Sequence, residues 1–139
     1  MTQTANENPT NGKRVLIVDD DRFITRVLMM KLEQEGFQVF VAHNGSEGFE
    51  QVMKYKPQVV VTDLNMPIMN GWELCTQIDQ APEENPHIII TTSLIEHKER
   101  DRVKEFSNAR LVDKPVSPKE ICALIQECLE YSAREGEQK

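Results

Sequence analysis

The sequence predicts an α/β fold, a doubly wound parallel sheet of five strands with helices on both faces. Short apolar runs of strand length alternate along the chain with segments whose apolar residues recur at helical spacing. The run Val59–Thr62 is apolar until its last residue, as is typical of a central parallel strand buried on both sides. Because strand–helix–strand connections are right-handed, their succession covers both faces of such a sheet with helices.

Each element has its own local signal. The expected strands are Lys13–Val18, Gln38–Val41, Val59–Thr62, His87–Thr91 and Arg110–Asp113. The expected helices are Asp21–Glu35, Ser46–Lys54, Trp72–Gln80, Glu96–Phe106 and one that starts at Pro118. Gly36 is placed to end the first helix, and Ser117 with Glu120 forms a capping box for the last. The helix Glu96–Phe106 has a thin apolar side, so we expect it to dock weakly.

Length and composition indicate one soluble domain. The 139 residues divide into a flexible N-terminal leader (1–12), one folded domain (13–131) and a charged C-terminal tail (132–139). The net charge of −7 argues against direct nucleic-acid binding. The three cysteines form no CxxC pair and indicate reduced thiols. No signal segment or bilayer-length apolar run is present, so we expect a cytoplasmic protein with no membrane contact.

Reactive polar residues stand where four of the expected strands end. Asp19 and Asp20 follow the first strand, Asp63 the third, and Lys114 the fifth. The fourth strand ends in Thr91, Thr92 and Ser93. Because the carboxyl ends of parallel strands share one edge, where ligands bind, these groups should meet in one pocket. Carboxylates, a hydroxyl and an ammonium suit a hard divalent cation together with a phosphoryl group.

Each residue also has a structural interpretation, which the pattern alone leaves open. Asp19 and Asp20 could be a solvated turn or a helix cap, and Asp63 an Asx turn. Lys114 could be a surface lysine before a proline, and the three hydroxyl residues could reflect strand and loop preferences. Alternatively, Asp63 could carry a phosphoryl group as an acyl phosphate, for which an ionised carboxylate needs charge neutralisation and no activating base.

Four segments together resemble the receiver domain of two-component response regulators, over about Lys13 to Glu130. They are Val-Leu-Ile-Val-Asp-Asp (15–20), the run from Val59 to Leu74, Ile-Ile-Ile-Thr-Thr-Ser (88–93) and Val-Asp-Lys-Pro-Val (112–116). One segment alone is weak, whereas all four in this order are highly specific. The resemblance implies a flavodoxin-like sheet with strand order 2-1-3-4-5.

The resemblance also implies a role for each residue of the pocket. Asp63 is the expected phosphoacceptor, and Asp19, Asp20, Asp63 and the backbone carbonyl of Asn65 are the expected ligands of Mg²⁺ or Mn²⁺. Lys114, followed by Pro115, is the expected phosphoryl contact. Thr92 is the expected switch hydroxyl because it lies 22 residues before Lys114, which leaves Ser93 as the small residue after it and Thr91 as the second choice.

One position departs from the family's usual pattern. Receivers often carry Tyr or Phe three residues before the lysine, and here that residue is Leu111. An aromatic rotation coupled to the hydroxyl is therefore not expected, which leaves a smaller shift of the loop after the fourth strand.

The function implied is a stand-alone phosphorylation switch of a two-component phosphorelay. A histidine kinase or phosphotransfer protein would supply the phosphoryl group, and output would pass through protein contacts to a partner that the sequence does not identify. Such a protein is not an enzyme toward other substrates, and a homodimer is left open. One alternative is a phosphatase of the haloacid-dehalogenase type, which Asn65 disfavours because that class has Asp at this position. A second is a receiver that is never phosphorylated. A third is a flavin-binding protein, which the lack of a phosphate loop after the first strand disfavours.

Overall fold

The computed structural model describes residues 12–81, 86–93 and 95–137, with side chains as far as Tyr131. The predicted leader, 1–12, lies outside the described residues except for Gly12, whose backbone N–H donates to the carbonyl of Gly36. Of the predicted tail, 132–139, only the backbone to residue 137 is described.

The five strands form one parallel sheet in the order β2-β1-β3-β4-β5, so the predicted fold class and strand order are confirmed. The strands are β1 (Arg14–Val18), β2 (Gln38–Ala42), β3 (Val59–Asp63), β4 (His87–Thr92) and β5 (Ala109–Asp113). Strands that come first, third and fourth along the chain are neighbours in the centre, so the carboxyl ends of β1, β3 and β4 meet at one edge.

The helices are α2 (Arg22–Gln34), α3 (Gly45–Tyr55), α4 (Gly71–Gln80), α5 (His97–Val103) and α6 (Pro118–Glu137). Side chains of Asp21, Asn44 and Asn70 accept backbone N–H groups at the starts of α2, α3 and α4, as N-cap residues do. The capping box predicted for the last helix is present: Glu120 N–H donates to Ser117 Oγ, and Ser117 N–H donates to Glu120 Oε1.

Two helix ends differ from the prediction by more than one residue. α5 ends at Val103 rather than Phe106, because Glu105 and Phe106 donate to carbonyls only three residues back, and the Phe106 ring turns to stack with Trp72. α6 continues to Glu137, into the segment assigned to the tail, since no proline or early glycine interrupts it.

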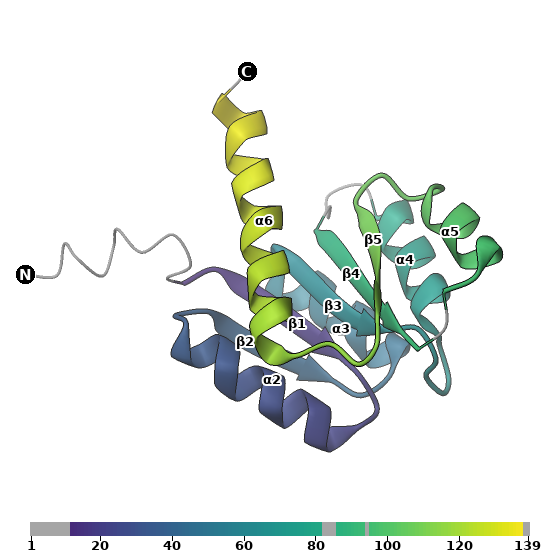
Figure 1. The fold of residues 1–139 in the computed structure, drawn as a ribbon, viewed down its shortest axis with the longest axis horizontal. Coiled ribbons are helices and arrows are strands. Elements are labelled where there is room, and N and C mark those ends of the chain that lie inside the picture. Colours follow the sequence, from purple (N-terminus) through teal and green to yellow (C-terminus); the bar gives the residue numbers. More distant parts are fainter. Residues whose placement is uncertain (1–11, 82–85, 94, 138–139) are drawn as a thin grey trace, which may run out of the picture.

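Helices cover both faces of the sheet, as Figure 1 shows. On one face, Leu28 and Leu32 of α2 and Ile121 and Ile125 of α6 pack with alternate residues of β1, β3 and β4. On the other face, α3 and α4 pack against the intervening strand residues. This alternation buries the strands on both sides and fixes the position of the residues that follow them.

Candidate functional site

Three carboxylates meet at the carboxyl edge of β1 and β3. The pairing of Val18 with Thr62 sets the next residues, Asp19 and Asp63, beside each other. One carboxylate oxygen from each of Asp19, Asp20 and Asp63 lies within 4.8 Å of the other two. Asp19 is 4% exposed and Asp63 8%, whereas Asp20 is exposed. The predicted acidic cluster is therefore present in the fold.

Asp19 is fixed by its own loop. Its backbone N–H donates to the Ala42 carbonyl (3.1 Å), and its Oδ1 accepts the N–H of Asp21 (2.9 Å). Asp21 caps α2, so the capping role falls on the third aspartate and leaves the first two for the pocket. Burial raises the pKa of Asp19 above its usual value, and the charges of Asp63 and Asp20 add to the rise, against the Asp21 N–H and Lys114.

Close backbone packing holds Asp63 at the end of β3. The N–H of Leu64 donates to the Thr91 carbonyl (3.0 Å), and the N–H of Gly71 donates to the Leu64 carbonyl (2.8 Å). A Cβ on Gly71 would lie 2.8 Å from the Asp63 carbonyl oxygen, so only glycine fits there without movement. The first residue of α4 thereby packs directly against the backbone of Asp63, the expected phosphoacceptor.

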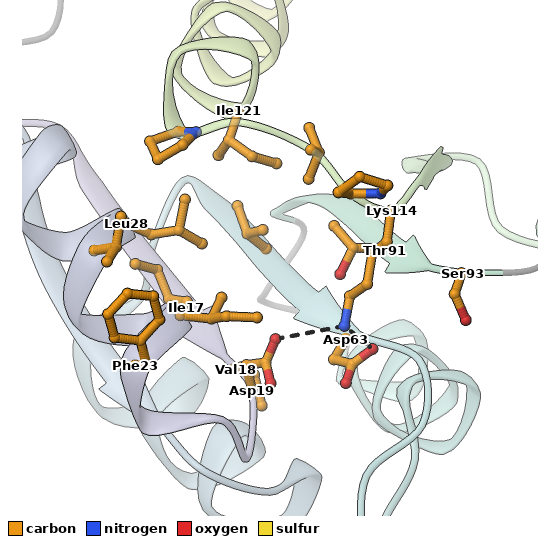
Figure 2. A pocket seen from close by; sticks show the side chains of 16 residues that line it. Ile17, Val18, Asp19, Phe23, Leu28, Asp63, Thr91, Ser93, Lys114 and Ile121 are labelled. Atoms are coloured by element: carbon orange, nitrogen blue, oxygen red, sulfur yellow. Dashed lines mark ion pairs between the residues drawn. The ribbon is translucent and has the colours of Figure 1, made fainter.

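Lys114 brings a cation to the acids from β5. Its Nζ lies 3.0 Å from Asp63 Oδ1 and 3.9 Å from Asp19 Oδ2, and Figure 2 shows the ammonium between the two carboxylates. Its backbone N–H donates to the Thr92 carbonyl (2.8 Å), and the bond from Lys114 to Pro115 is cis. Residues 19, 63 and 114, far apart in sequence, are thus in contact.

The three hydroxyl candidates take different positions. Thr91, paired with Asp63 in the sheet, and Ser93 line the cavity that Asp63 and Lys114 also line. Thr91 Oγ1 donates to the Thr62 carbonyl (3.4 Å). Thr92 is buried and is not among the residues that line this cavity. Thr91 and Ser93 therefore line the cavity that Asp63 and Lys114 line, and the role predicted for Thr92 stays a prediction.

The remaining predicted residues differ in where they lie. Asn65 is exposed, two residues beyond Asp63, and its carbonyl as a ligand stays a prediction. Pro115 is exposed and lines the cavity. Leu111 is paired with Ile90 and packs in the apolar cluster of the opposite face, so no aromatic ring fills that position.

Asp19 and Asp63 open onto an apolar cavity of about 420 Å³ between α2 and α6. Figure 2 shows its walls, which include Ile17, Leu28 and Ile121, with Asp19, Asp63 and Lys114 at one end. Sequence reasoning did not single out this cavity, nor His43, whose ring Nδ1 lies 3.1 Å from the Asp19 carbonyl oxygen. The end of β2 was a signal for His43, because it lies at the same edge of the sheet as the acids.

The donor set fits a hard divalent cation. Three carboxylates with the Lys114 ammonium among them leave an excess of negative charge in a partly buried pocket. Oxygen ligands from one or two carboxylates, with waters completing the shell, are what Mg²⁺ takes in proteins.

A parallel sheet in this order, with an Asp–Asp–Asp–Lys cluster at its carboxyl edge, is the arrangement that the resemblance to receiver domains implied. The profile of the response regulator receiver domain matches residues 15–126, and the chain belongs to that family. It is therefore a receiver domain of two-component signalling.

Among relatives, the chain is 31% identical over 123 residues to the alkaline phosphatase synthesis transcriptional regulatory protein PhoP of Bacillus subtilis, covering 87% of this chain and 50% of that protein. It is 35% identical over 117 residues to the probable transcriptional regulator ycf27 of Pyropia yezoensis, covering 84% and 47%. The chain thus spans about half the length of the curated relatives it matches. The expectation of no nucleic-acid binding remains a prediction.

Solved structures share the fold. A CheY-like receiver domain protein from Methanospirillum hungatei superimposes with a TM-score of 0.80 at 28% identity, covering 90% of this chain and 99% of that one. The chemotaxis response regulator CheY4 of Vibrio cholerae gives 0.78 at 24% identity, covering 85% and 99%. In the part of the chain that the structure describes, no helix has both the length and the apolar character needed to cross a bilayer.

Proposed function

We propose that this receiver is a phosphorylation switch that accepts a phosphoryl group on Asp63 in a step that depends on Mg²⁺ or Mn²⁺. The observation that carries the proposal is the 3.0 Å approach of Lys114 Nζ to Asp63 Oδ1 beside two further carboxylates. A carboxylate that accepts an anionic phosphoryl group needs cations around it, and this pocket provides one and has the ligands for a second.

The donor class is a phosphohistidine of a histidine kinase or phosphotransfer protein. In the transfer, an Asp63 oxygen forms a bond to phosphorus while the bond from phosphorus to the imidazole nitrogen breaks. The imidazole leaves with the electron pair and takes up a proton from solvent. A bound divalent cation would neutralise charge on the phosphoryl oxygens, with Asp19, Asp20, Asp63 and the Asn65 carbonyl as its ligands. Lys114 would move from a carboxylate oxygen to a phosphoryl oxygen.

Asp63 is more accessible to a donor than its burial alone suggests. Its side chain lines the open cavity beside α2, and the exposed Phe23 lines the same cavity. The modified side chain would carry roughly −1.5 to −2 charges and three acceptor oxygens, enough to attract a nearby hydroxyl. The signal would then pass by protein contacts through α5, β5 and α6, without turnover of a separate substrate. Stand-alone action and the downstream protein partner are part of this proposal.

Intact-mass spectrometry tests the acceptor directly. Incubation with acetyl phosphate and Mg²⁺ should add about 80 Da, the mass of one phosphoryl group. The gain should disappear in Asp63→Asn and with EDTA in place of Mg²⁺, and should persist in the matched control Asp101→Asn, which removes an exposed carboxylate from α5. An unmodified wild type would favour a receiver that is never phosphorylated. An equal gain in Asp63→Asn would place the acceptor elsewhere.

A pair of isosteric substitutions identifies the switch hydroxyl. Thr91→Val and Thr92→Val each delete one hydroxyl and keep the β-branched shape. Phosphorylation of the wild type should change the fluorescence of Trp72. If Thr92 is the switch residue, only Thr92→Val should abolish that change while Asp63 is still modified. If Thr91→Val alone abolishes it, the hydroxyl that already lines the cavity has that role.

A further inference from the structure

The backbone carbonyl of Asp19 contacts a side chain from the loop between β2 and α3. β1 pairs with β2 through Val18 and Ala42, and the ladder is extended by the Asp19 N–H, which donates to the Ala42 carbonyl (3.1 Å). A parallel ladder that continued would next bring a backbone N–H from beyond His43 to the Asp19 carbonyl. Instead, Nδ1 of the His43 ring lies 3.1 Å from that oxygen.

The direction of this hydrogen bond follows from its acceptor. A carbonyl oxygen only accepts, so Nδ1 of His43 carries the hydrogen and donates it. The side chain thus takes the place of a ladder donor at the point where the chain leaves β2. Both backbone polar groups of Asp19 are then engaged by the consecutive residues Ala42 and His43.

His43 is itself fixed by the start of α3. Its backbone N–H donates to Glu47 Oε1 (3.1 Å), while the Glu47 N–H donates to Asn44 Oδ1 (2.8 Å). These two bonds tie the residue to the first turn of α3, which packs against β1. The half-buried ring is therefore presented to Asp19 from a rigid support.

The peptide unit that His43 holds is the one that orients Asp20. The Asp19 carbonyl belongs to the peptide plane between Asp19 and Asp20, and that plane sets the direction of the Asp20 side chain relative to its neighbour. The Asp19 carboxylate is anchored because it accepts the N–H of Asp21, but the exposed Asp20 carboxylate accepts no hydrogen bond from any residue that the structure describes. Asp20 depends on its backbone for its position.

We propose that His43 is a positioning residue for the acidic pair, and that its Nδ1–H holds the peptide between Asp19 and Asp20 in the orientation that a divalent cation requires. This inference rests on the proposed function, because it concerns the same cation site. Groups that orient the ligands of a metal are worth roughly 10- to 100-fold in metal affinity when they contact the ligating group itself. One neutral hydrogen bond to a backbone carbonyl should contribute less, roughly three- to tenfold.

The test is a Mn²⁺ titration followed by the electron paramagnetic resonance signal of free Mn²⁺, which measures binding without any phosphorylation. His43→Leu removes the donor and should weaken binding roughly three- to tenfold. His43→Asn places an amide N–H near the position of Nδ1 and should restore binding to within about twofold of the wild type. The matched control His97→Leu removes an exposed histidine from α5 and should leave binding unchanged.

Each outcome decides the inference. Unchanged Mn²⁺ binding in His43→Leu would overturn it, and so would a His43→Asn protein that binds as weakly as His43→Leu, because the ring volume rather than the donor would then matter. Circular dichroism confirms that each variant is folded, and His43→Ala replaces His43→Leu if the latter is not. A wild type that binds no Mn²⁺ would instead refute the metal part of the proposed function and this inference with it.

Discussion

Asp19→Asn should stabilise the metal-free protein, although it removes a residue of the proposed cation site. With an effective dielectric constant of about 20, two unit charges 4.8 Å apart interact by roughly 3.5 kcal/mol. Asp19 is repelled at this distance or less by two carboxylates and attracted by Lys114 at 3.9 Å, a contact of roughly 4 kcal/mol on the same scale. Solvent around the exposed Asp20 reduces its share, so the net repulsion is about 1–3 kcal/mol.

The sign of the pH dependence follows from the raised pKa of Asp19. A carboxyl whose pKa is higher in the folded than in the unfolded state favours folding below the ordinary value of 3.8, and that contribution is lost as the pH rises through the folded-state pKa. The ionised wild type therefore carries the cost at neutral pH. The advantage of Asp19→Asn should be largest there and should vanish as the pH falls toward 3.8. Asparagine retains an oxygen for the Asp21 N–H.

Urea denaturation in EDTA measures the free energy of unfolding of both proteins at neutral pH and again in acid. Asp101→Asn is the control, because it removes an equal charge from an exposed site and should change stability by less than about 0.5 kcal/mol. Added Mg²⁺ should stabilise the wild type more than Asp19→Asn. An Asp19→Asn protein no more stable than the wild type in EDTA would refute the argument from charge crowding.

Three further substitutions separate the parts of the site. Lys114→Met should keep cation binding but slow phosphorylation of Asp63 by acetyl phosphate at least roughly tenfold, since it removes the protein's own charge from the phosphoryl position; an unchanged rate by intact mass would contradict this. Gly71→Ala places a Cβ 2.8 Å from the Asp63 carbonyl and should cost about 1–3 kcal/mol in urea while also slowing phosphorylation; a stable, fully active variant would show that α4 does not position Asp63. Ile121→Ala, at a fully buried position of α6, should cost about 2–5 kcal/mol yet leave Asp63 competent as an acceptor, and loss of phosphorylation in the folded variant would speak against that separation.

The cluster of Asp19, Asp63 and Lys114 could be predicted from sequence because the carboxyl ends of parallel strands lie at one edge of the sheet. Four apolar runs followed by polar groups were sufficient to bring Asp19, Asp63 and Lys114 together, and the contacts at 3.0 and 3.9 Å confirm this. The order of the strands could not be predicted in the same way. Periodicity assigns a run to a strand but carries no information on its neighbours, so the order came from the resemblance to a family.

Features that depend on tertiary packing could not be predicted. α5 ends early because the Phe106 ring reaches Trp72 on α4, a contact between residues far apart in sequence. The contact of His43 with the Asp19 carbonyl depends on the register of β1 and β2, which a histidine after a short strand does not reveal. Both cases show the limit of local sequence signals. Such signals locate helices and strands, whereas contacts of side chains between elements can be predicted only once the strand register is known.

The two adjacent threonines show why one residue of register decides where a signal would go. Successive side chains of β4 point to opposite faces, so Thr91 faces the cavity between α2 and α6. By the same alternation, Thr92 shares the face of Ile90, where Leu111 and Phe106 belong to one apolar cluster. Movement of Thr92 would therefore act on the face of the sheet that α4 and α5 share. There the Phe106 ring stacks with Trp72 of α4, and the Arg102 guanidinium of α5 lies 5.6 Å from the centre of the Trp72 ring. Movement of Thr91 would act on the opposite face, which α2 and α6 cover. If one of these threonines is the switch hydroxyl of the proposed function, its identity should determine which face of the sheet changes on phosphorylation.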